Sequence, residues 1–183
     1  MSDLKQLRYG YGLKQVERSC SVAKRKESAA EHSWSCLILA DYFLTKIKLD
    51  RLKVYEMLIY HDLVEIETGD VDILNVEKRY SKKEQELKAI KVVEKKVPPL
   101  LSLKIKKLFL EFEEQKTKEA KFSKAIDALD AEIHELDYKK DWQGWTEAFL
   151  RKSKEHLFAD FPELRKMFEE TTKYARENGF FEK

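Results

Sequence analysis

Three ionisable residues interrupt an otherwise apolar helical face in the segment VYEMLIYHDLVEIETGD. The segment predicts a helix over 50–66, on which His61, Asp62 and Glu65 fall on or beside the face that carries Leu58. Burying such groups without partners would cost several kcal/mol, because isolated charges lose their hydration. A shared metal ion would remove that conflict.

A second predicted helix, over 28–46, carries His32 on a face with apolar residues, namely Ala29, Cys36, Leu39, Ala40 and Phe43. A single histidine on an apolar face is most often a hydrogen-bonded core residue. Together with the His61-Asp62 dipeptide on another inward face, it favours a shared metal ion. Imidazoles and carboxylates suit Mn, Co, Fe, Ni or Zn, and four such ligands on a six-coordinate ion leave two positions open.

A further carboxylate ligand is expected from the helix predicted over 117–139. Its apolar stripe is flanked by Asp127, Asp130 and Asp137. Each of these residues could equally be a surface carboxylate, and helical periodicity does not choose among them.

The composition predicts a single all-α domain. The 183 residues are 38% charged and 43% hydrophobic and include only five glycines and three prolines, which favours helices over a β-sandwich. Ser28 with Glu31, and Ser81 with Glu84, have the spacing of capping boxes, Thr117 can cap another helix, and Gly179 can end the last one. The expected helices are 3–9, 28–46, 50–66, 81–96, 100–114, 117–139, 145–156 and 162–177, with a loop over Gly69–Tyr80 and a break at Pro98-Pro99.

Charge and cysteine content exclude several classes of protein. The 36 basic and 34 acidic residues are intermixed, so charge gives no argument for a nucleic-acid polymer as partner. Two cysteines cannot form a disulfide framework, which indicates a reducing compartment. We find no apolar segment typical of a signal peptide or a membrane span. The expectation is a cytoplasmic protein without a membrane partner.

The spacing of these motifs resembles a known family. His32 in ESAAEHSW, His61-Asp62 in LIYHDLVEIETGD, and Asp127 in EFEEQKTKEAKFSKAIDALDAEI are together similar to the HD-domain superfamily of metal-dependent phosphohydrolases. The likeness is to the branch that contains the bacterial 5′-deoxynucleotidase and its eukaryotic relatives, and it covers the chain from about Leu4 to Asp137. It implies an HD-domain helical bundle over 1–183, with a core of about 26–140 and terminal helices packed on it.

The resemblance also assigns roles to residues. It implies one divalent metal ion (Mn, Co, Fe, Ni, Zn or Mg) and four ligands, His32, His61, Asp62 and Asp127. It implies that Glu65 is the catalytic acid or base and that Asp70 contacts the sugar and belongs to the catalytic set. Arg18 corresponds to a phosphate-binding arginine, with Arg25 as the competing candidate because RSCSVAKRKES lacks the aromatic residue and glycine expected after that arginine. Relatives with two metals carry additional histidines, which the stretch from Leu63 to Ile126 does not contain.

The expected function is metal-dependent removal of the 5′ phosphate from (deoxy)nucleoside monophosphates, with a small-molecule nucleotide as substrate. Glu65 would position the attacking water or protonate the departing sugar oxygen. The alternatives are a metal- or nucleotide-binding HD module without turnover, and a phosphohydrolase or phosphodiesterase acting on another nucleotide. The resemblance further implies a homodimer, to which an aromatic C-terminal region could contribute unless it completes the monomer core; that region contains Trp142, Trp145, Phe149 and Phe158.

Overall fold

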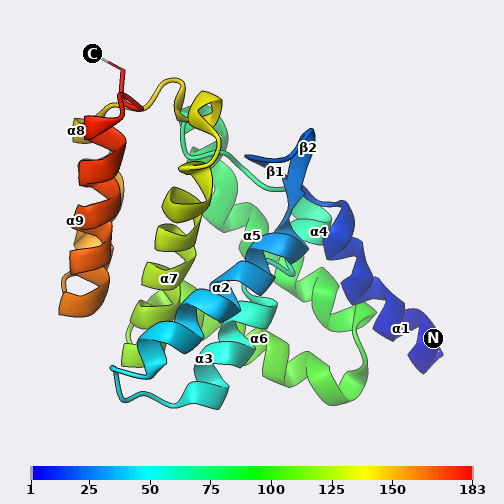
Figure 1. Cartoon of the computed structure of the whole chain (residues 1–183). Helices are drawn as coiled ribbons and strands as arrows, with labels where there is room; N and C mark the ends of the chain where they lie inside the picture. Colours follow the sequence, from blue (N-terminus) through cyan, green and yellow to red (C-terminus); the bar gives the residue numbers. More distant parts are fainter. Residues whose placement is uncertain (1, 183) are drawn as a thin grey trace.

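Helices form most of the structure, a computed structural model that describes residues 2–182 (Figure 1). They are α1 (Asp3–Gly10), α2 (Ala29–Leu44), α3 (Arg51–Tyr60), α4 (Glu65–Thr68), α5 (Val76–Lys96), α6 (Pro99–Glu114), α7 (Lys118–Glu135), α8 (Glu147–Lys154) and α9 (Pro162–Glu177). Single 3₁₀ turns occupy Tyr11–Gln15, Lys139–Trp142 and Glu155–Phe158. The all-α prediction is confirmed. Within residues 2–182, every helix is too short or too polar to cross a lipid bilayer.

One β-hairpin was missed by the sequence patterns. Strands β1 (Glu17–Val22) and β2 (Arg25–Ser28) pair antiparallel, with Val22 opposite Arg25 and an irregularity between Glu17 and Ser21. Two short, largely polar strands give too little alternation for a periodicity argument to detect. The hairpin matters because it leads directly into α2 and carries Arg18 on its first strand.

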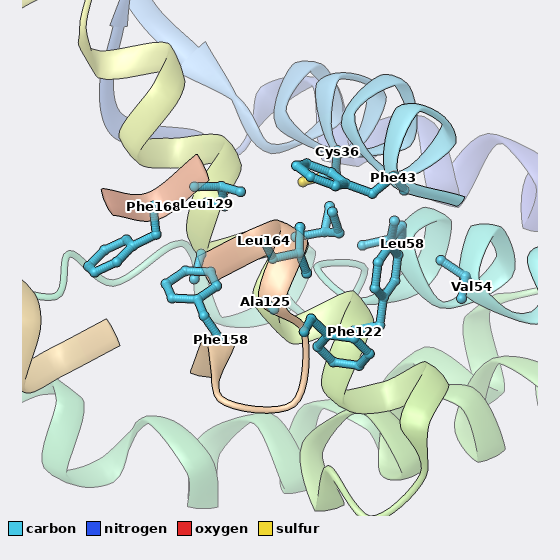
Figure 2. Close-up of a cluster of buried hydrophobic side chains, with 14 of the residues drawn as sticks. Cys36, Phe43, Val54, Leu58, Phe122, Ala125, Leu129, Phe158, Leu164 and Phe168 are labelled. Carbon is cyan, nitrogen blue, oxygen red and sulfur yellow. The ribbon is translucent and has the colours of Figure 1, made fainter. Parts of the chain in front are cut away.

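The larger hydrophobic core joins α2, α3 and α7 to the C-terminal helices, with α9 running beside α7 (Figures 1 and 2). Its buried side chains include Cys36, Phe43, Val54, Leu58, Phe122, Ala125, Leu129, Phe158, Leu164 and Phe168. Trp142, Trp145 and Phe158 are buried in the same core. The C-terminal aromatic residues therefore complete the core of one chain, and these three do not offer a surface for dimerisation.

A second hydrophobic cluster lies behind the His61-Asp62 segment. It packs Leu63 and Val64 against α5 and α6 through Ala89, Ile90, Val93, Val97, Ile105 and Phe109. Because Leu63 and Val64 directly follow the dipeptide in sequence, their burial fixes the backbone that presents His61 and Asp62 to the other side.

The predicted continuous helix over 50–66 is wrong. The chain leaves α3 after Tyr60, and Leu63 and Glu65 donate their backbone N–H groups to the carbonyls of Tyr60 and Asp62, three residues earlier. Such i to i+3 bonds form a tighter turn than the i to i+4 bonds of an α-helix. His61 and Asp62 therefore lie in a turn between α3 and α4.

Helix starts agree with the predicted capping residues at two of three positions. Ser28 and Glu31 form a reciprocal capping box at the start of α2, and Thr117 caps α7. The box predicted at Ser81 is wrong, because Asn75 caps α5 by accepting from the backbone N–H of Lys78 and places Ser81 inside the helix. The predicted loop over Gly69–Tyr80 consequently ends at Asn75.

These caps allow a matched stability test. We expect Ser28→Ala to lower the free energy of unfolding by about 1 kcal/mol, because the backbone N–H of Glu31 loses the Ser28 hydroxyl that accepts its hydrogen bond at the start of α2. Ser81→Ala should change it by less than about 0.5 kcal/mol, since alanine suits a helix interior. Urea unfolding of both variants measures this difference. Equal destabilisation would contradict the assigned start of α5.

Candidate metal centre and its pocket

A cavity of about 430 Å³ lies against α7 and the turn that follows α3. Hairpin strand β1, the start of α5 and the loop after α4 also contribute to its walls. Among the predicted site residues, it is lined by Arg18, His61, Asp62, Glu65, Asp70 and Asp127. Residues that are far apart in the sequence are thus brought to one site.

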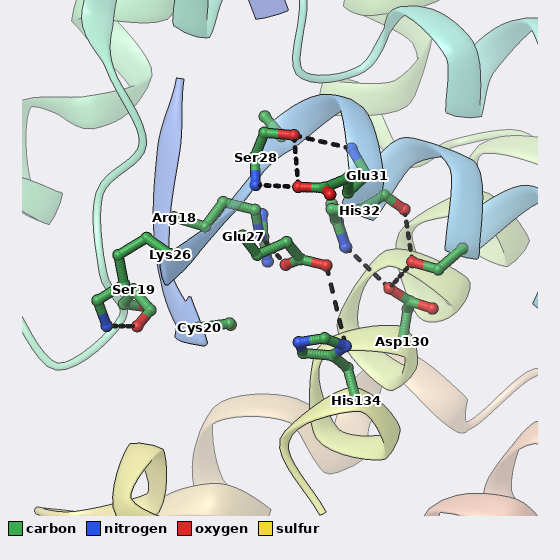
Figure 3. A network of polar contacts seen from close by, with 12 residues as sticks. Arg18, Ser19, Cys20, Lys26, Glu27, Ser28, Glu31, His32, Asp130 and His134 are labelled. Carbon is green, nitrogen blue, oxygen red and sulfur yellow. Dashed lines mark hydrogen bonds and ion pairs between the residues drawn. The ribbon is translucent and has the colours of Figure 1, made fainter. Parts of the chain in front are cut away.

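His32 lies one turn into α2 and connects this helix to α7. Its Nε2 is 3.0 Å from Asp127 Oδ1, and its Nδ1 is 2.9 Å from Asp130 Oδ2 (Figure 3 shows the Asp130 contact). Ser35 Oγ donates a second hydrogen bond to Asp130 Oδ2 at 2.7 Å. Asp130 therefore fixes the orientation of the His32 ring through Nδ1, while Asp127 lies next to Nε2 on the side of the cavity.

The turn at His61 aims this side chain and Asp62 toward the same point. His61 Nδ1 is 2.9 Å from the carbonyl oxygen of Leu58, which leaves Nε2 facing Asp62 Oδ1 at 3.2 Å and Asp127 Oδ1 at 3.9 Å. Both residues are buried. The convergence predicted from a helical face is therefore produced by a tight turn instead.

The geometry and bonding of this group fit a divalent cation. Ligand bonds of about 2.1 Å place neighbouring ligand atoms roughly 3 to 4 Å apart, which matches the 3.0, 3.2 and 3.9 Å separations here. His61 Nε2, Asp62 Oδ2 and Glu65 Oε2 are buried polar atoms without a hydrogen-bond partner among the described residues. An unsatisfied buried polar group destabilises a folded protein by about 1–3 kcal/mol, so a ligand that bonds these atoms would remove this destabilisation.

Of the three aspartates that periodicity left open, Asp127 faces the cavity. Asp130 is engaged with the outer nitrogen of His32, and Asp137 follows the end of α7 at an exposed position outside the cavity lining. A second group of potential ligands, His32, Cys36 and Asp130, shares His32 with the first. Burial raises the pKa of the Cys36 thiol to about 12, which opposes formation of the thiolate that binds metals.

Lysines that the sequence patterns did not identify surround the acidic centre. Lys124 Nζ lies 2.9 Å from Asp127 Oδ2 and 4.7 Å from the centre of the Phe112 ring. Burial opposes ionisation of Asp127, but Lys124 and the two histidines outweigh it and hold the pKa of that carboxyl well below its usual range. Lys124 is one turn before Asp127 on α7, so helical spacing could have identified it once Asp127 was chosen.

Glu65 begins α4 and is almost fully buried, with 2% of its surface exposed. Its Oε1 accepts a hydrogen bond from Nζ of Lys82, a lysine of α5, at 3.3 Å. Burial first, and then the nearby Asp62, raise the pKa of the Glu65 carboxyl well above its usual range. Asp70 follows Gly69, whose φ of +72° favours glycine, and lines the cavity from the loop after α4.

The structure brings Arg18, and not Arg25, to the cavity. Arg18 Nε donates to Glu27 Oε2 at 3.1 Å, as drawn in Figure 3, and its Nη1 lies 3.7 Å from Asp62 Oδ2. Arg25 is exposed and pairs with Glu31 on the outer side of the hairpin. The missed hairpin is thus the element that separates the two candidates, because it directs one arginine inward and the other outward.

Comparisons with known proteins found a family model and curated relatives that match most of this chain. A family model described as HD domain matches residues 11–165. The 5′-deoxynucleotidase hdd1 of Schizosaccharomyces pombe is 28% identical over 125 residues, which are 66% of this chain and 63% of that protein. Human 5′-deoxynucleotidase HDDC2 is 28% identical over 133 residues, 69% of this chain and 63% of that protein. The chain thus spans slightly less than two thirds of the length of these relatives.

Solved structures show the same fold. A predicted metal-dependent phosphohydrolase from Magnetospirillum magnetotacticum MS-1 has a TM-score of 0.85 and 26% identity, and the match covers 98% of both chains. An HD-domain phosphohydrolase from Listeria innocua has a TM-score of 0.65 and 20% identity, and covers 97% of this chain and 87% of that one. The second likeness supports the fold alone.

Proposed function

This chain belongs to the HD domain family, and we propose that it is a metal-dependent phosphomonoesterase that removes the 5′ phosphate from (deoxy)nucleoside monophosphates. The observation that carries the proposal is the set of buried ligand atoms of His61 and Asp62 that lack hydrogen-bond partners among the described residues, at the wall of a cavity that Arg18 also lines. The names of the relatives from S. pombe and human supply the class of substrate.

We assign the cation to four ligands, His32, His61, Asp62 and Asp127, and propose a single divalent ion. When bound there, such an ion polarises a phosphoryl group and lowers the pKa of water. Asp130 is assigned to hold the His32 ring in place, because it bonds the nitrogen on the far side of that ring.

We assign proton transfer to Glu65. Lys82 holds one of its carboxyl oxygens at 3.3 Å, while Oε2 has no partner among the described residues. The carboxyl group is thereby fixed in orientation and retains a free oxygen to position the attacking water or to protonate the departing sugar oxygen. Asp70, in the neighbouring loop, is assigned to accept hydrogen bonds from the sugar hydroxyl groups and to complete the catalytic set.

Phosphate binding is assigned to Arg18, and the ammonium group of Lys124 adds positive charge on the α7 side. Glu27 and Asp62 orient the Arg18 guanidinium from two directions. A planar guanidinium oriented in this way can offer two N–H groups to phosphate oxygens and stabilise negative charge in the transition state.

We also propose a single HD domain over 1–183 that works in the cytoplasm, consistent with two free cysteines at Cys20 and Cys36.

We further propose a homodimer. It is supported by exposed apolar residues spaced four apart on α2, namely Trp34, Ile38 and Tyr42. Sedimentation velocity at micromolar concentration measures this state, and a clean monomer would contradict it.

The reaction class is tested by phosphate release from a panel of nucleotides with each of several divalent metals. We expect release from nucleoside 5′ monophosphates, none from 3′ monophosphates or cyclic nucleotides, and loss of activity after chelation that metal restores. Binding of nucleotides without release in any metal would favour a binding module. Release from diesters would favour a phosphodiesterase.

The role of Glu65 has a matched control on the same short helix. We expect Glu65→Gln to lower kcat by about 10²- to 10⁴-fold, the usual contribution of a positioned acid or base, while the bound metal content stays unchanged. Glu67→Gln should retain full activity, because Glu67 bonds Tyr9 and Lys96 outside the cavity. Loss of metal in Glu65→Gln would instead indicate a ligand role.

The two arginine candidates are separated by lysine substitutions, which keep the positive charge but remove the planar fork. We expect Arg18→Lys to lower kcat/KM about tenfold or more, mainly through KM, because a charge-assisted hydrogen bond to phosphate is lost. Arg25→Lys should match the wild type. Steady-state kinetics on one nucleoside monophosphate measure both, and an effect confined to Arg25→Lys would overturn the assignment.

A further inference from the structure

The cavity continues well beyond the metal centre along one face of α7. Asp127, Ala128, Ala131 and Glu135 all line it, and they follow the spacing of three and four residues that keeps side chains on one helical face. Eight residues separate Asp127 from Glu135, which is about 12 Å along a helix at 1.5 Å per residue. The two alanines between them have small side chains and therefore leave space for a ligand along this face of α7.

This length suits a nucleotide whose phosphate lies at the metal centre. About ten covalent bonds of roughly 1.5 Å connect the phosphorus through the sugar to an exocyclic amino group of a base, and a zigzag path of that kind spans on the order of 10 Å. A nucleotide laid along α7 from Asp127 therefore brings the edge of its base to the level of Glu135.

The end of the cavity at Glu135 has side chains that can bind a nucleobase. Buried Glu135 lines the cavity and accepts a hydrogen bond on Oε1 from Cys20 Sγ at 3.0 Å. The neighbouring acid Asp141 is already engaged, since it accepts from the backbone N–H and the hydroxyl of Ser21 at 2.6 and 2.9 Å. Trp145 supplies an aromatic wall. Glu135 is thus the acidic acceptor left for a ligand.

Lys154 adds a donor to the same end of the cavity. It is buried, pairs with Glu132 and lies 5.4 Å from the centre of the Trp145 ring. Both Lys154 and Glu135 line the cavity. None of these groups takes part in the chemistry assigned to the metal centre, so their burial beside the cavity calls for another role.

We propose that the end of the cavity formed by Cys20, Glu135, Trp145 and Lys154 is a nucleobase subsite that selects bases with an exocyclic amino group. This inference rests on the proposed function, since it places the phosphate at the metal centre. Burial and the neighbouring Glu132 raise the pKa of the Glu135 carboxyl to about 7, so the selectivity applies above that pH. The ionised carboxylate accepts hydrogen bonds from the amino group of cytosine, whereas the carbonyl that uracil presents at the same position repels it. The subsite therefore prefers dCMP over dUMP, which differ in this group and in the adjacent ring nitrogen N3.

The test measures equilibrium binding and phosphate release for dCMP, dUMP and deoxyribose 5-phosphate, which lacks a base. We expect the wild type to bind dCMP about tenfold or more tightly than dUMP, as the loss of one charge-assisted hydrogen bond implies. Glu135→Gln should remove this preference, because an amide can also donate, and should leave deoxyribose 5-phosphate unchanged. Asp137→Asn, which alters an exposed carboxylate just past α7 and outside the cavity, is the matched control.

A second variant tests the location independently of hydrogen bonding. Ala131→Leu fills the floor between the two ends, so both nucleotides should bind more weakly while deoxyribose 5-phosphate binds as before. Equal weakening of all three ligands, or a dCMP preference that survives in Glu135→Gln, would overturn the subsite. Selective binding without phosphate release would retain the subsite and reject the proposed reaction, whereas failure of every nucleotide to bind would reject both.

Discussion

The structure depends on the meeting of α2 and α7 at His32. Two carboxylates of α7 contact the two ring nitrogens of this fully buried residue, at 2.9 and 3.0 Å. Burying charged groups is unfavourable unless they are paired and hydrogen-bonded. His32 satisfies Asp130 on its outer side and presents Asp127 to the cavity, so a single imidazole both joins two helices and builds half of the proposed ligand set.

The other half is held by hydrophobic packing. Leu58 belongs to the large core, while Leu63 and Val64 belong to the separate cluster against α5 and α6. The His61-Asp62 turn therefore lies between two clusters that hold the chain at both ends. This packing compensates for leaving His61 Nε2 and Asp62 Oδ2 without hydrogen-bond partners among the described residues, in accord with the general observation that locally unfavourable groups persist where the surrounding structure determines them.

The sequence alone predicted the helical fold and the ligand types but not the local geometry of the site. Inward-facing His32 and His61-Asp62 followed from periodicity, because apolar neighbours mark a buried face. Asp127 did not, since three aspartates border the same stripe, and only the family resemblance selected it. The turn at His61 escaped prediction because three ionisable residues suited a helical face equally well. Arg18 was placed inward by a hairpin whose two short polar strands carry little periodic signal.

Helix α7 shows how one amphipathic element can serve both packing and function. Phe122, Ala125, Ile126 and Leu129 are fully buried in the large core. The neighbouring face presents Lys124, Asp127, Ala131 and Glu135 to the cavity. Asp127 and Glu135 lie on one continuous helix, so the helical rise sets their axial separation, and packing of the first face against α2, α3 and α9 holds that helix beside the cavity. The helix that completes the core thus also sets the distance between the metal centre and the far end of the cavity, and with it the length of a ligand that can reach both.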